Sequence, residues 1–430
     1  MIKIYFSLVN LYKTKIKGLM MSKKLYFLLI SFSILITLQA KAYNFDTDIK
    51  VGAENTKEYI KLLKGKNVAI IANHTSMVGN QHLVDTLLSL GINVKKIFAP
   101  EHGFRGLNDA GSHINNSIDK KTGLPIVSLY GKNRKPTAEQ LKGIDIVVFD
   151  IQDVGVRFYT YISTMMLAME ACAENNVSFL VLDRPNPNGY FVDGPVLQMK
   201  YKSFIGMMPI PIVYGLTEAE LATMINGESW LKNGIKCDLH YVLCKGYDHS
   251  KIYKLPIKPS PNLPNMTAIL YYPTLGILEG TSLSVGRGTE KPFQYVGHPE
   301  LSDGYLEFTP KSMPGAKHPK WEGKKCHGYD VNDNGIDYIV EKRGIGIACI
   351  LKAYANSPKE DFFKSSFNRL AGNSNLKLQL QFLEQEDNIR ASWKKDLDVY
   401  KKMRKKYLLY TDFKEENNDL DKLKNKLNFK

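Results

Sequence analysis

Glu101 is the residue of this sequence whose type and position best suit acid catalysis. It directly follows an apolar run and precedes His102 and a Gly-Phe-Arg-Gly turn. A carboxyl group beside an aromatic ring, in partly buried backbone, can have a raised pKa, which suits a general acid. The alternative is structural, since Glu101 could cap the next helix or pair with Arg105. We expect His102 and Arg105 to contact a ligand bound at Glu101.

A second segment is dense in hydrogen-bonding and aromatic side chains. Its carboxylates, Asp150 and Asp153, are candidates for a second catalytic group. Arg157 can form two parallel hydrogen bonds to an anion, and Tyr159 and Tyr161 can stack on the face of a sugar ring. The alternative is an internal ion pair between Arg157 and one of the two aspartates.

Two other segments offer polar side chains for ligand binding. Asn73 follows an apolar run, and Asp183, Arg184 and Asn186 lie in a proline-rich turn after another run. Because proline stiffens such a turn, its side chains are held in fixed positions.

The clearest cluster in the C-terminal half is rich in glycine and contains Glu279, Arg287 and Thr289. Glycines let the backbone approach a ligand closely, and Arg287 could bind an anionic group. Gly286-Arg-Gly288 is not a dinucleotide fingerprint, because the third glycine, the preceding βα context and a later acidic partner are missing. No P-loop occurs either, so we expect no cofactor.

The cysteines and histidines do not indicate a metal site. The five cysteines are scattered, and no Cys-x-x-Cys pair or Cys/His ligand spacing occurs. This pattern signals neither a zinc site nor a disulfide framework. One disulfide and a set of buried free thiols are both compatible with it.

These chemical groups follow short apolar runs that predict the strands of a sheet. Helical apolar spacing lies between some of the runs, and continuous apolar strands alternating with helices predict a mostly parallel sheet covered on both faces. Ligands bind outside the carboxyl ends of the strands in such folds, so loops from this edge should share one pocket. The predicted strands cover residues 67–72, 94–99, 125–129, 145–149 and 177–182, and the predicted helices cover residues 81–90 and 160–175.

The sequence divides into a leader and two predicted domains. Residues 255–265 contain four prolines and predict a domain connection. We predict an α/β, Rossmann-like domain over residues 43–262 and a smaller α+β domain over residues 263–430.

Residues 1–42 have the features of a secretory signal peptide. Lys23 and Lys24 precede an apolar run, and Ala40-Lys-Ala42 follows it. A positive start, a short apolar middle and a small-residue exit are typical of such signals, and the run is short for a membrane helix. We therefore expect a protein that is exported to the periplasm or secreted, without stable membrane insertion after cleavage. An uncleaved membrane anchor is the alternative.

The positive charge does not indicate a nucleic-acid partner. Seven of the lysines behind the formal net charge of +15 lie in residues 1–42, which contain no acid. The basic run over residues 401–406 favours a solvated helix face, and no nucleic-acid-binding motif is present. The sequence does not predict an oligomeric state.

Several of these segments, taken in order, resemble a known family. The resemblance runs from about residue 50 to beyond 400 and is to the exo-β-N-acetylmuramidases of glycoside hydrolase family 171, formerly a domain of unknown function. The motifs that carry it are Asn73-His-Thr-Ser, Pro100-Glu-His-Gly-Phe-Arg-Gly106, Phe149-Asp-Ile-Gln-Asp-Val-Gly-Val-Arg-Phe-Tyr-Thr-Tyr161, Leu182-Asp-Arg-Pro-Asn-Pro187, Tyr214-Gly-Leu-Thr-Glu-Ala-Glu-Leu221, Ser260-Pro-Asn-Leu-Pro264 and Glu279-Gly-Thr-Ser-Leu-Ser-Val-Gly-Arg-Gly-Thr289.

The resemblance implies a Rossmann-like domain and a smaller C-terminal domain with the active cleft between them. It also implies an activity, the release of N-acetylmuramic acid from the non-reducing end of peptidoglycan-derived glycan fragments. The family's proposed catalytic glutamate lies in the Pro-Glu-His-Gly motif, which assigns that role to Glu101 here.

Glycosidases commonly add a second carboxylate, although the substrate's own acetamido group can act instead. Muramic acid carries a lactyl carboxylate, which a bidentate arginine would bind. Arg157 or Arg287 is our choice, with Arg105 behind them. The candidates for the second carboxylate are Asp150, Asp153, Asp183 and Glu279.

Two other functions are compatible with parts of this pattern. A non-catalytic cell-wall glycan-binding protein on the same scaffold would keep the arginines and aromatic rings and tolerate Glu101→Gln. A cell-wall esterase or amidase would need an activated nucleophile, and no Gly-x-Ser-x-Gly elbow is present.

Overall fold

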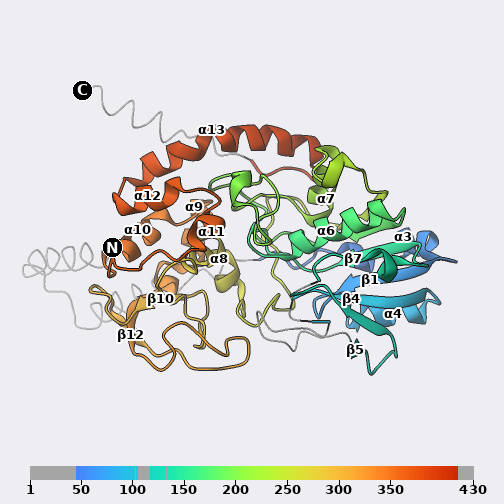
Figure 1. Cartoon of the computed structure of the whole chain (residues 1–430), viewed down its shortest axis with the longest axis horizontal. Helices are drawn as coiled ribbons and strands as arrows, with labels where there is room; N and C mark the ends of the chain where they lie inside the picture. The colour runs from blue at the N-terminus through green and yellow to red at the C-terminus, as the bar shows by residue number, and fades with distance from the viewer. Residues whose placement is uncertain (1–44, 102, 105–116, 132, 415–430) are drawn as a thin grey trace, which may run out of the picture. The chain divides into compact units, whose positions relative to one another are not determined.

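The structure is a computed structural model that describes residues 45–101, 103–104, 117–131 and 133–414 (Figure 1). His102 and Arg105, which were predicted to contact a ligand, lie outside the described residues. The signal peptide predicted over residues 1–42 lies outside them too.

The N-terminal part of the chain contains a mostly parallel sheet, as predicted. In the part that the structure describes, seven strands have the order β5-β6-β4-β1-β7-β8-β9. Neighbouring strands are parallel except for β5 and β6, which are antiparallel at one edge. The strands are β1 (Asn67–Ala72), β4 (Asn93–Ala99), β5 (Ser117–Ile118), β6 (Pro125–Ser128), β7 (Ile146–Asp150), β8 (Ser178–Leu182) and β9 (Leu239–Val242).

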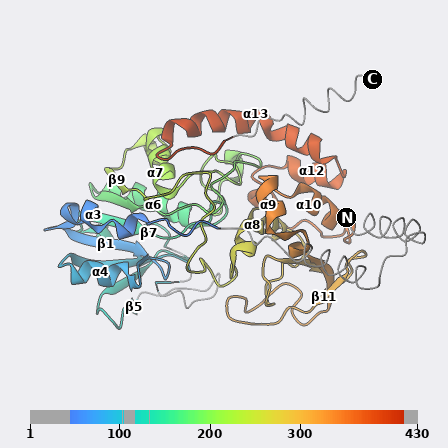
Figure 2. The same ribbon diagram turned by 180° about the vertical axis from the view of Figure 1, so that it is seen from behind.

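Helices cover both faces of this sheet. They are α3 (Thr56–Leu63), α4 (Leu83–Ser89), α5 (Ala138–Leu141), α6 (Tyr161–Glu174) and α7 (Glu218–Gly227). On one face, Val68, Ile70 and Ala72 of β1 share a core cluster with residues of α3 and α4. On the other face α6 and α7 contact β8, and Figure 2 shows them across the sheet from α4. This two-sided burial explains why the central strands β1, β7 and β8 read as continuous apolar runs.

The helix predicted over residues 81–90 begins later than expected. Gln81–His82 form β3, which pairs with β2 (Met77–Val78) in a short hairpin. The His82 ring then accepts a hydrogen bond at 3.2 Å from the second backbone N–H of α4 and so caps that helix. The predicted end is confirmed, because Gly91 has a φ of 76°, the left-handed geometry in which helices commonly terminate.

The C-terminal part is α+β, as predicted. A three-stranded antiparallel sheet consists of β10 (Tyr295–His298), β12 (Cys326–Asp330) and β11 (Leu306–Phe308), in that order. Its helices are α8 (Met266–Leu278), α9 (Gly335–Lys342), α10 (Ile347–Ala355), α11 (Phe367–Ala371), α12 (Asn375–Gln381) and α13 (Glu386–Arg404). Short 3-10 helices are η2 (Gly52–Glu54), η3 (Met199–Tyr201), η4 (Lys232–Gly234), η5 (Val331–Asn334) and η6 (Lys405–Tyr407).

The proline-rich connection over residues 255–265 contains no helix or strand. Asn265 ends it, because its side chain accepts a hydrogen bond from the Ala268 N–H at 3.0 Å and caps α8. Residues on both sides of the connection pack in a single compact unit, so the predicted domain boundary near residue 262 stays a prediction.

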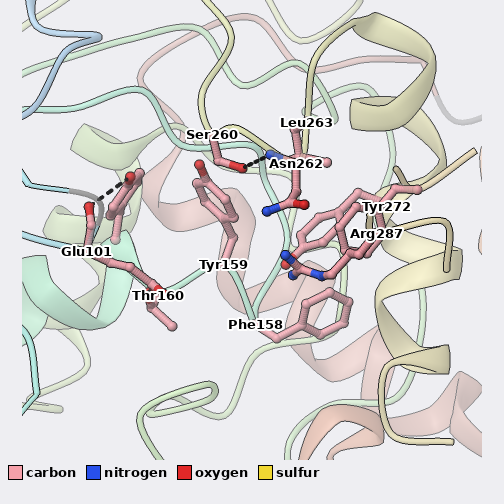
Figure 3. Close-up of a pocket in the computed structure, with 11 residues that line it drawn as sticks. Glu101, Phe158, Tyr159, Thr160, Ser260, Asn262, Leu263, Tyr272 and Arg287 are labelled. Atoms are coloured by element: carbon pink, nitrogen blue, oxygen red, sulfur yellow. Dashed lines mark hydrogen bonds between the residues drawn. The ribbon is translucent and has the colours of Figure 1, made fainter. Parts of the chain in front are cut away.

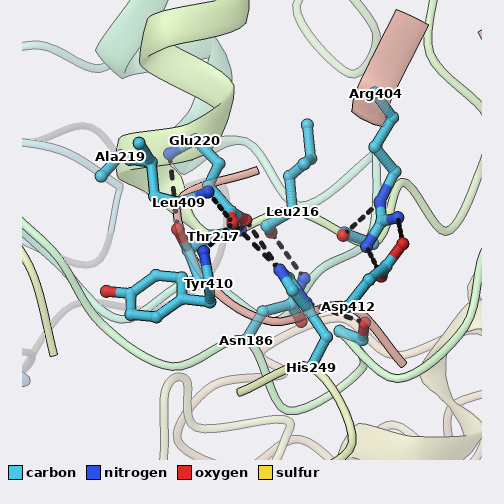
Figure 4. Close-up of polar contacts among 12 residues, drawn as sticks. Asn186, Leu216, Thr217, Ala219, Glu220, His249, Arg404, Leu409, Tyr410 and Asp412 are labelled. Carbon is cyan, nitrogen blue, oxygen red and sulfur yellow. Dashed lines mark hydrogen bonds and ion pairs between the residues drawn. The ribbon is translucent and has the colours of Figure 1, made fainter. Parts of the chain in front are cut away.

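The segment that follows α13 returns to the N-terminal part (Figure 4). Arg404 is buried, donates from Nε to the Gly215 carbonyl at 2.7 Å and pairs through both Nη groups with Asp412 at 2.8 Å. The Tyr410 hydroxyl donates to the Asp183 carboxylate at 2.6 Å. Asp183 directly follows β8, so this hydrogen bond holds the C-terminal segment at the edge of the sheet where the site was predicted.

Burial and chain length stabilise this fold without cross-links. All five cysteines are free thiols, and four of them are buried. Within the described ranges, no helix combines the length and the apolar character that a membrane span requires.

Candidate active site

The polar residues predicted to share a site begin at one edge of the sheet. Asn73 follows β1, Glu101 comes two residues after β4, Asp150 ends β7 and Asp183 follows β8. These strands are parallel, with Ala72 of β1 paired to Asp150 of β7. The strand order turns outward in both directions from the β1 and β7 pair, which is where open α/β sheets bind ligands.

A pocket at this edge brings the two parts of the chain together (Figure 3). Glu101 lines it from the N-terminal sheet, and Arg287 lines it from the C-terminal part. Its volume of about 70 Å³ is below the roughly 300 Å³ at the lower end of small-molecule sites, so it can hold the reacting part of a ligand. The other lining residues are Phe158, Tyr159, Thr160, Tyr161, Ser260, Asn262, Leu263, Tyr272 and Phe293.

The Glu101 carboxyl group is half-buried and is oriented by hydroxyl groups. Thr160 Oγ1 donates to Glu101 Oε2 at 3.2 Å, and the Tyr161 hydroxyl donates to the Glu101 backbone carbonyl at 3.5 Å. Burial raises the pKa of Tyr130, and the nearby Glu101 carboxylate, which accepts a hydrogen bond from this hydroxyl, raises it further. Tyr130 therefore stays protonated and remains a hydrogen-bond donor. Glu101 thus combines a fixed orientation with access to the pocket.

Arg287 is held at the pocket by Glu279 and by an aromatic ring. Its Nε lies 2.7 Å from Glu279 Oε1, with side-chain exposures of 27% and 29%. Its guanidinium carbon lies 4.9 Å from the centre of the Phe293 ring. Burial lowers the pKa of Arg287, but Glu279 outweighs this effect, so the net shift is upward and the group stays charged. Its Nη groups form no hydrogen bond with the described residues, and they are available to an anion.

Aromatic rings line the pocket between Glu101 and Arg287 (Figure 3). Tyr272 makes edge-to-face contacts with Phe158, Tyr159 and Phe293, at centroid distances of 5.3, 5.9 and 4.8 Å. The Tyr159 hydroxyl donates to a backbone carbonyl of the proline-rich connection at 2.9 Å. These contacts fix the rings relative to one another. Tyr159 and Tyr161, the two tyrosines predicted to stack on a sugar, both line the pocket.

The two aspartates predicted as catalytic candidates are directed into the protein interior. Arg184 binds both oxygens of Asp150, at 2.6 and 3.0 Å, and both side chains are buried. Asp153 accepts hydrogen bonds from the Gly155 N–H at 2.5 Å and from the Tyr214 hydroxyl. Burial raises the pKa of Asp153 to about 7. Neither aspartate lines the pocket.

Arg157, one of the two arginines chosen for the lactyl carboxylate, also lies in the interior. It is fully buried and donates to the carbonyls of Pro195 at 2.7 Å, Ile210 at 2.8 Å and Leu370 at 2.9 Å. It does not line the pocket at Glu101, and it forms no ion pair with Asp150 or Asp153, which was the alternative. Arg287 is therefore the arginine that the structure places at the pocket.

The remaining predicted binding residues form hydrogen bonds within the protein. Asn73 accepts hydrogen bonds from the backbone and hydroxyl of Thr75 at 2.8 and 2.6 Å. Asn186 donates to the Leu216 carbonyl at 2.8 Å. Burial raises the pKa of Asp183 to about 7, and Thr289 closes its own turn by donating to a carbonyl at 2.7 Å.

Sequence reasoning missed several residues of the pocket. Thr160 belongs to one of the motifs, but nothing in the sequence indicates that its hydroxyl contacts Glu101. Ser260 and Asn262 belong to a segment interpreted only as a connection, although it was one of the motifs of the family resemblance. Tyr272 lies in the apolar helix α8, where nothing in the pattern distinguishes it from a core residue. In the described residues, no group of three or more His, Cys, Asp or Glu side chains could hold a metal ion.

Comparisons with known proteins cover most of the chain. The family model described as exo-β-N-acetylmuramidase NamZ, N-terminal, matches residues 68–267, and its C-terminal counterpart matches residues 270–410. A Bacillus subtilis (strain 168) protein named peptidoglycan β-N-acetylmuramidase NamZ is 41% identical over 378 residues, which cover 82% of this chain and 89% of that protein.

Two crystal structures of DUF1343 family proteins from Bacteroides fragilis NCTC 9343 are also similar. The first, at 1.30 Å resolution, is 48% identical with a TM-score of 0.79, and the second, at 1.65 Å, is 34% identical with a TM-score of 0.66. Each match covers 85% of this chain and 100% of the solved chain.

Proposed function

Because the chain belongs to the exo-β-N-acetylmuramidase NamZ family, we propose that it releases N-acetylmuramic acid from the non-reducing end of peptidoglycan-derived glycan fragments. Family membership makes it a glycosidase. The proposed release of N-acetylmuramic acid is supported by the pocket itself. There the carboxyl group of Glu101 and the guanidinium of Arg287 face one cavity from two parts of the chain.

Glu101 is the general acid of the proposed reaction. It donates its proton to the glycosidic oxygen as the bond from that oxygen to the anomeric carbon breaks. Thr160 and Tyr130 hold the carboxyl group in one orientation, which reduces the entropy lost on reaching the transition state.

We propose that the second group of the reaction is either Glu279, which does not line the pocket itself but pairs with Arg287 there, or the substrate's acetamido oxygen. Asp150, Asp153 and Asp183 are each held by buried hydrogen bonds, whereas Glu279 is partly exposed and joined to Arg287. In the acetamido route, the substrate's carbonyl oxygen forms the bond to the anomeric carbon and water then opens the ring. A substrate with a trifluoroacetamido group distinguishes the Glu279 route from the acetamido route. The carbonyl oxygen of that group is a weaker nucleophile, so it should slow the acetamido route far more.

Arg287 is the proposed ligand of the lactyl carboxylate. Two parallel N–H donors match the two oxygens of a carboxylate, and the internal partner Glu279 occupies only Nε. An N-acetylglucosamine residue has no lactyl group, so this contact would favour muramyl sugars at the non-reducing end.

The test is hydrolysis of a chromogenic N-acetyl-β-muraminide. We expect the wild type to be active and Glu101→Gln to lose activity by a factor of about 10²–10⁴, the usual contribution of general acid catalysis. Glu290→Gln, an exposed neighbour of the Arg287 loop, is the matched control. An inactive wild type contradicts the enzyme assignment, and an active Glu101→Gln protein moves the acid to another residue.

We also propose that the protein is exported and acts in the periplasm or outside the cell. The basic, apolar and small-residue order of residues 1–42 supports this. Mass spectrometry of the protein from fractionated cells should find a mature N-terminus just after Ala42, and an intact leader in the cytoplasm would contradict export.

A further inference from the structure

A second cavity lies in the C-terminal part, on another side of helix α8 from the pocket at Glu101. Its volume is about 370 Å³, within the roughly 300–1,000 Å³ typical of small-molecule sites. Tyr271 lines this cavity, whereas the next residue along α8, Tyr272, lines the pocket at Glu101. Consecutive helix residues point about 100° apart, so one helix separates the two cavities. Figure 2 shows α9 and α10 beside α8, and both contact it.

Four tyrosines dominate the wall of the second cavity. Tyr271 and Tyr329 are buried, whereas Tyr305 and Tyr338 are 62% and 45% exposed. A single exposed aromatic ring is ordinary, but several that adjoin one another mark a candidate binding surface, and the Tyr305 and Tyr329 rings lie 5.9 Å apart. The C–H groups of a pyranose ring carry partial positive charge and fit the negative face of an aromatic ring. Lysine ammonium groups already lie over two of the rings, Tyr329 at 4.3 Å and Tyr338 at 5.8 Å. The exposed parts of Tyr305 and Tyr338 are the tyrosine surface that suits a sugar.

The charged side chains of the cavity favour an uncharged ligand. Two lysines and two aspartates line it, so their formal charges cancel. Lys342 pairs with Glu386 at 3.3 Å, and Lys352 pairs with Asp303 at 3.4 Å. Because each lysine already has an acidic partner, an anion would have to compete for it.

The two aspartates have partners as well. Asp330 accepts from Lys291 at 2.8 Å, and Asp333 accepts from the Tyr305 hydroxyl. A cationic ligand would have to displace Lys291 from Asp330 and the Tyr305 hydroxyl from Asp333. Neutral hydroxyl and amide groups can still share these hydrogen-bonding atoms without displacing an ion pair.

We propose that this cavity is an accessory binding site for an uncharged N-acetylhexosamine residue of the glycan, separate from the pocket at Glu101. The choice of a glycan sugar rests on the proposed function, whereas the preference for a neutral pyranose rests on the tyrosines and the cancelled charges. A chain with both sites can hold a glycan fragment while its non-reducing end enters the pocket.

Binding of N,N′,N″-triacetylchitotriose to the full chain tests this proposal by calorimetry. We expect saturable binding, and Tyr338→Ala should raise Kd about fivefold or more because it removes an exposed stacking face. Tyr338→Phe keeps the ring and should change Kd less than about twofold. Alanine is the best helix former, so the substitution in α9 should not prevent folding. Tyr241→Ala, a 41% exposed tyrosine on β9, is the matched control.

Three results would overturn the proposal. They are no binding by the wild type, an unchanged Kd in Tyr338→Ala, and binding of zwitterionic trialanine in place of the sugar. The experiment uses no hydrolysis. If the muraminide is not cleaved but Tyr338-dependent binding persists, the proposed reaction fails and the accessory site stands.

Discussion

Nε of Arg287 lies 2.7 Å from Oε1 of Glu279, at the pocket that Glu101 lines from the other part of the chain. This geometry fixes the guanidinium plane, and its two Nη groups have no hydrogen-bond partner in the part of the chain that the structure describes. A planar guanidinium with two free donors recognises carboxylates more specifically than an ammonium group does. The pair therefore gives the pocket a basis for choosing muramyl over glucosaminyl sugars.

Replacing Arg287 with lysine should reduce this selectivity. We expect kcat/KM for a chromogenic N-acetylmuraminide to fall at least about tenfold, the equivalent of one charge-assisted hydrogen bond. The low rate for the matching N-acetylglucosaminide should change little, because that sugar has no carboxylate. Arg369→Lys, at an exposed site on α11, is the control. An equal loss of kcat/KM on both substrates would show that Arg287 supports the structure of the pocket and does not bind the lactyl carboxylate.

Replacing Arg157 with methionine should affect stability and leave selectivity unchanged. The substitution removes the donor to the buried carbonyls of Pro195 and Leu370, whereas the Ile210 carbonyl still accepts from the Leu197 N–H at 3.1 Å. Each unsatisfied buried group costs about 1–3 kcal/mol, so urea denaturation should show a loss of about 2 kcal/mol or more in the free energy of unfolding. KM for the muraminide should be unchanged at a temperature where the variant is folded. An altered KM at normal stability would place Arg157 at the ligand.

The contrast between Arg157 and Arg287 shows how far the sequence predicts this site. Apolar runs ending in polar residues predicted the parallel sheet, and so predicted that Glu101, Asp150 and Asp183 start from one edge. The strand pattern does not say whether a loop side chain turns toward the pocket or the interior. That direction depends on partners distant in sequence, such as the Leu370 carbonyl that accepts from Arg157.

The aromatic residues that line the pocket together with Glu101 were harder to predict, because their positions also depend on contacts distant in sequence. Tyr272 and Phe293 come from the C-terminal part, and the contact of Tyr272 with Tyr159 is a tertiary contact that no local pattern encodes. Arg287 was chosen as a guanidinium that could bind an anion, in a cluster whose glycines were expected to let the backbone approach a ligand. The structure gives Gly286 a different role, since its φ of 79° sets a turn and an added Cβ would lie 2.5 Å from the Lys291 carbonyl.

Stability should fall as the pH rises from 5 to 8, in part because of Asp153 and Asp183. Burial raises the pKa of each to about 7, well above the usual value near 3.9 of an unfolded chain. The native state therefore binds these protons more tightly than the unfolded state does. Their contribution is complete below about pH 4 and is lost as the pH rises through 7.

The pH dependence can be measured by urea unfolding at pH 5 and pH 8. Asp183→Asn removes one titrating group, so the loss of unfolding free energy between the two pH values should be smaller than in the wild type. Only this difference is compared, because the substitution also disturbs the hydrogen bonds from Ala219 and Tyr410. Asp396→Asn, on the exposed side of α13, should keep the wild-type slope. An unchanged slope in Asp183→Asn would refute the assignment.

Breaking the ion pair between Asp150 and Arg184 should destabilise the protein far more than breaking a surface pair. Both side chains are buried, and Arg184 also donates to the Met77 carbonyl at 3.1 Å. Removing one partner of a buried pair leaves an uncompensated charge, at a cost of roughly 3–5 kcal/mol. Asp150→Asn should therefore lower the free energy of unfolding by an amount in this range.

The control is the pair of Lys394 and Asp398 on the exposed face of α13, with a similar contact of 2.6 Å. Surface pairs contribute about 0–1 kcal/mol, so Lys394→Met should hardly change the urea midpoint. Burial pushes the pKa of Asp150 upward even against Arg184, so the carboxyl depends on this one partner to stay ionised. If Asp150→Asn proves as stable as Lys394→Met but inactive on the muraminide, Asp150 takes part in the chemistry and its pairing with Arg184 is not what the fold requires.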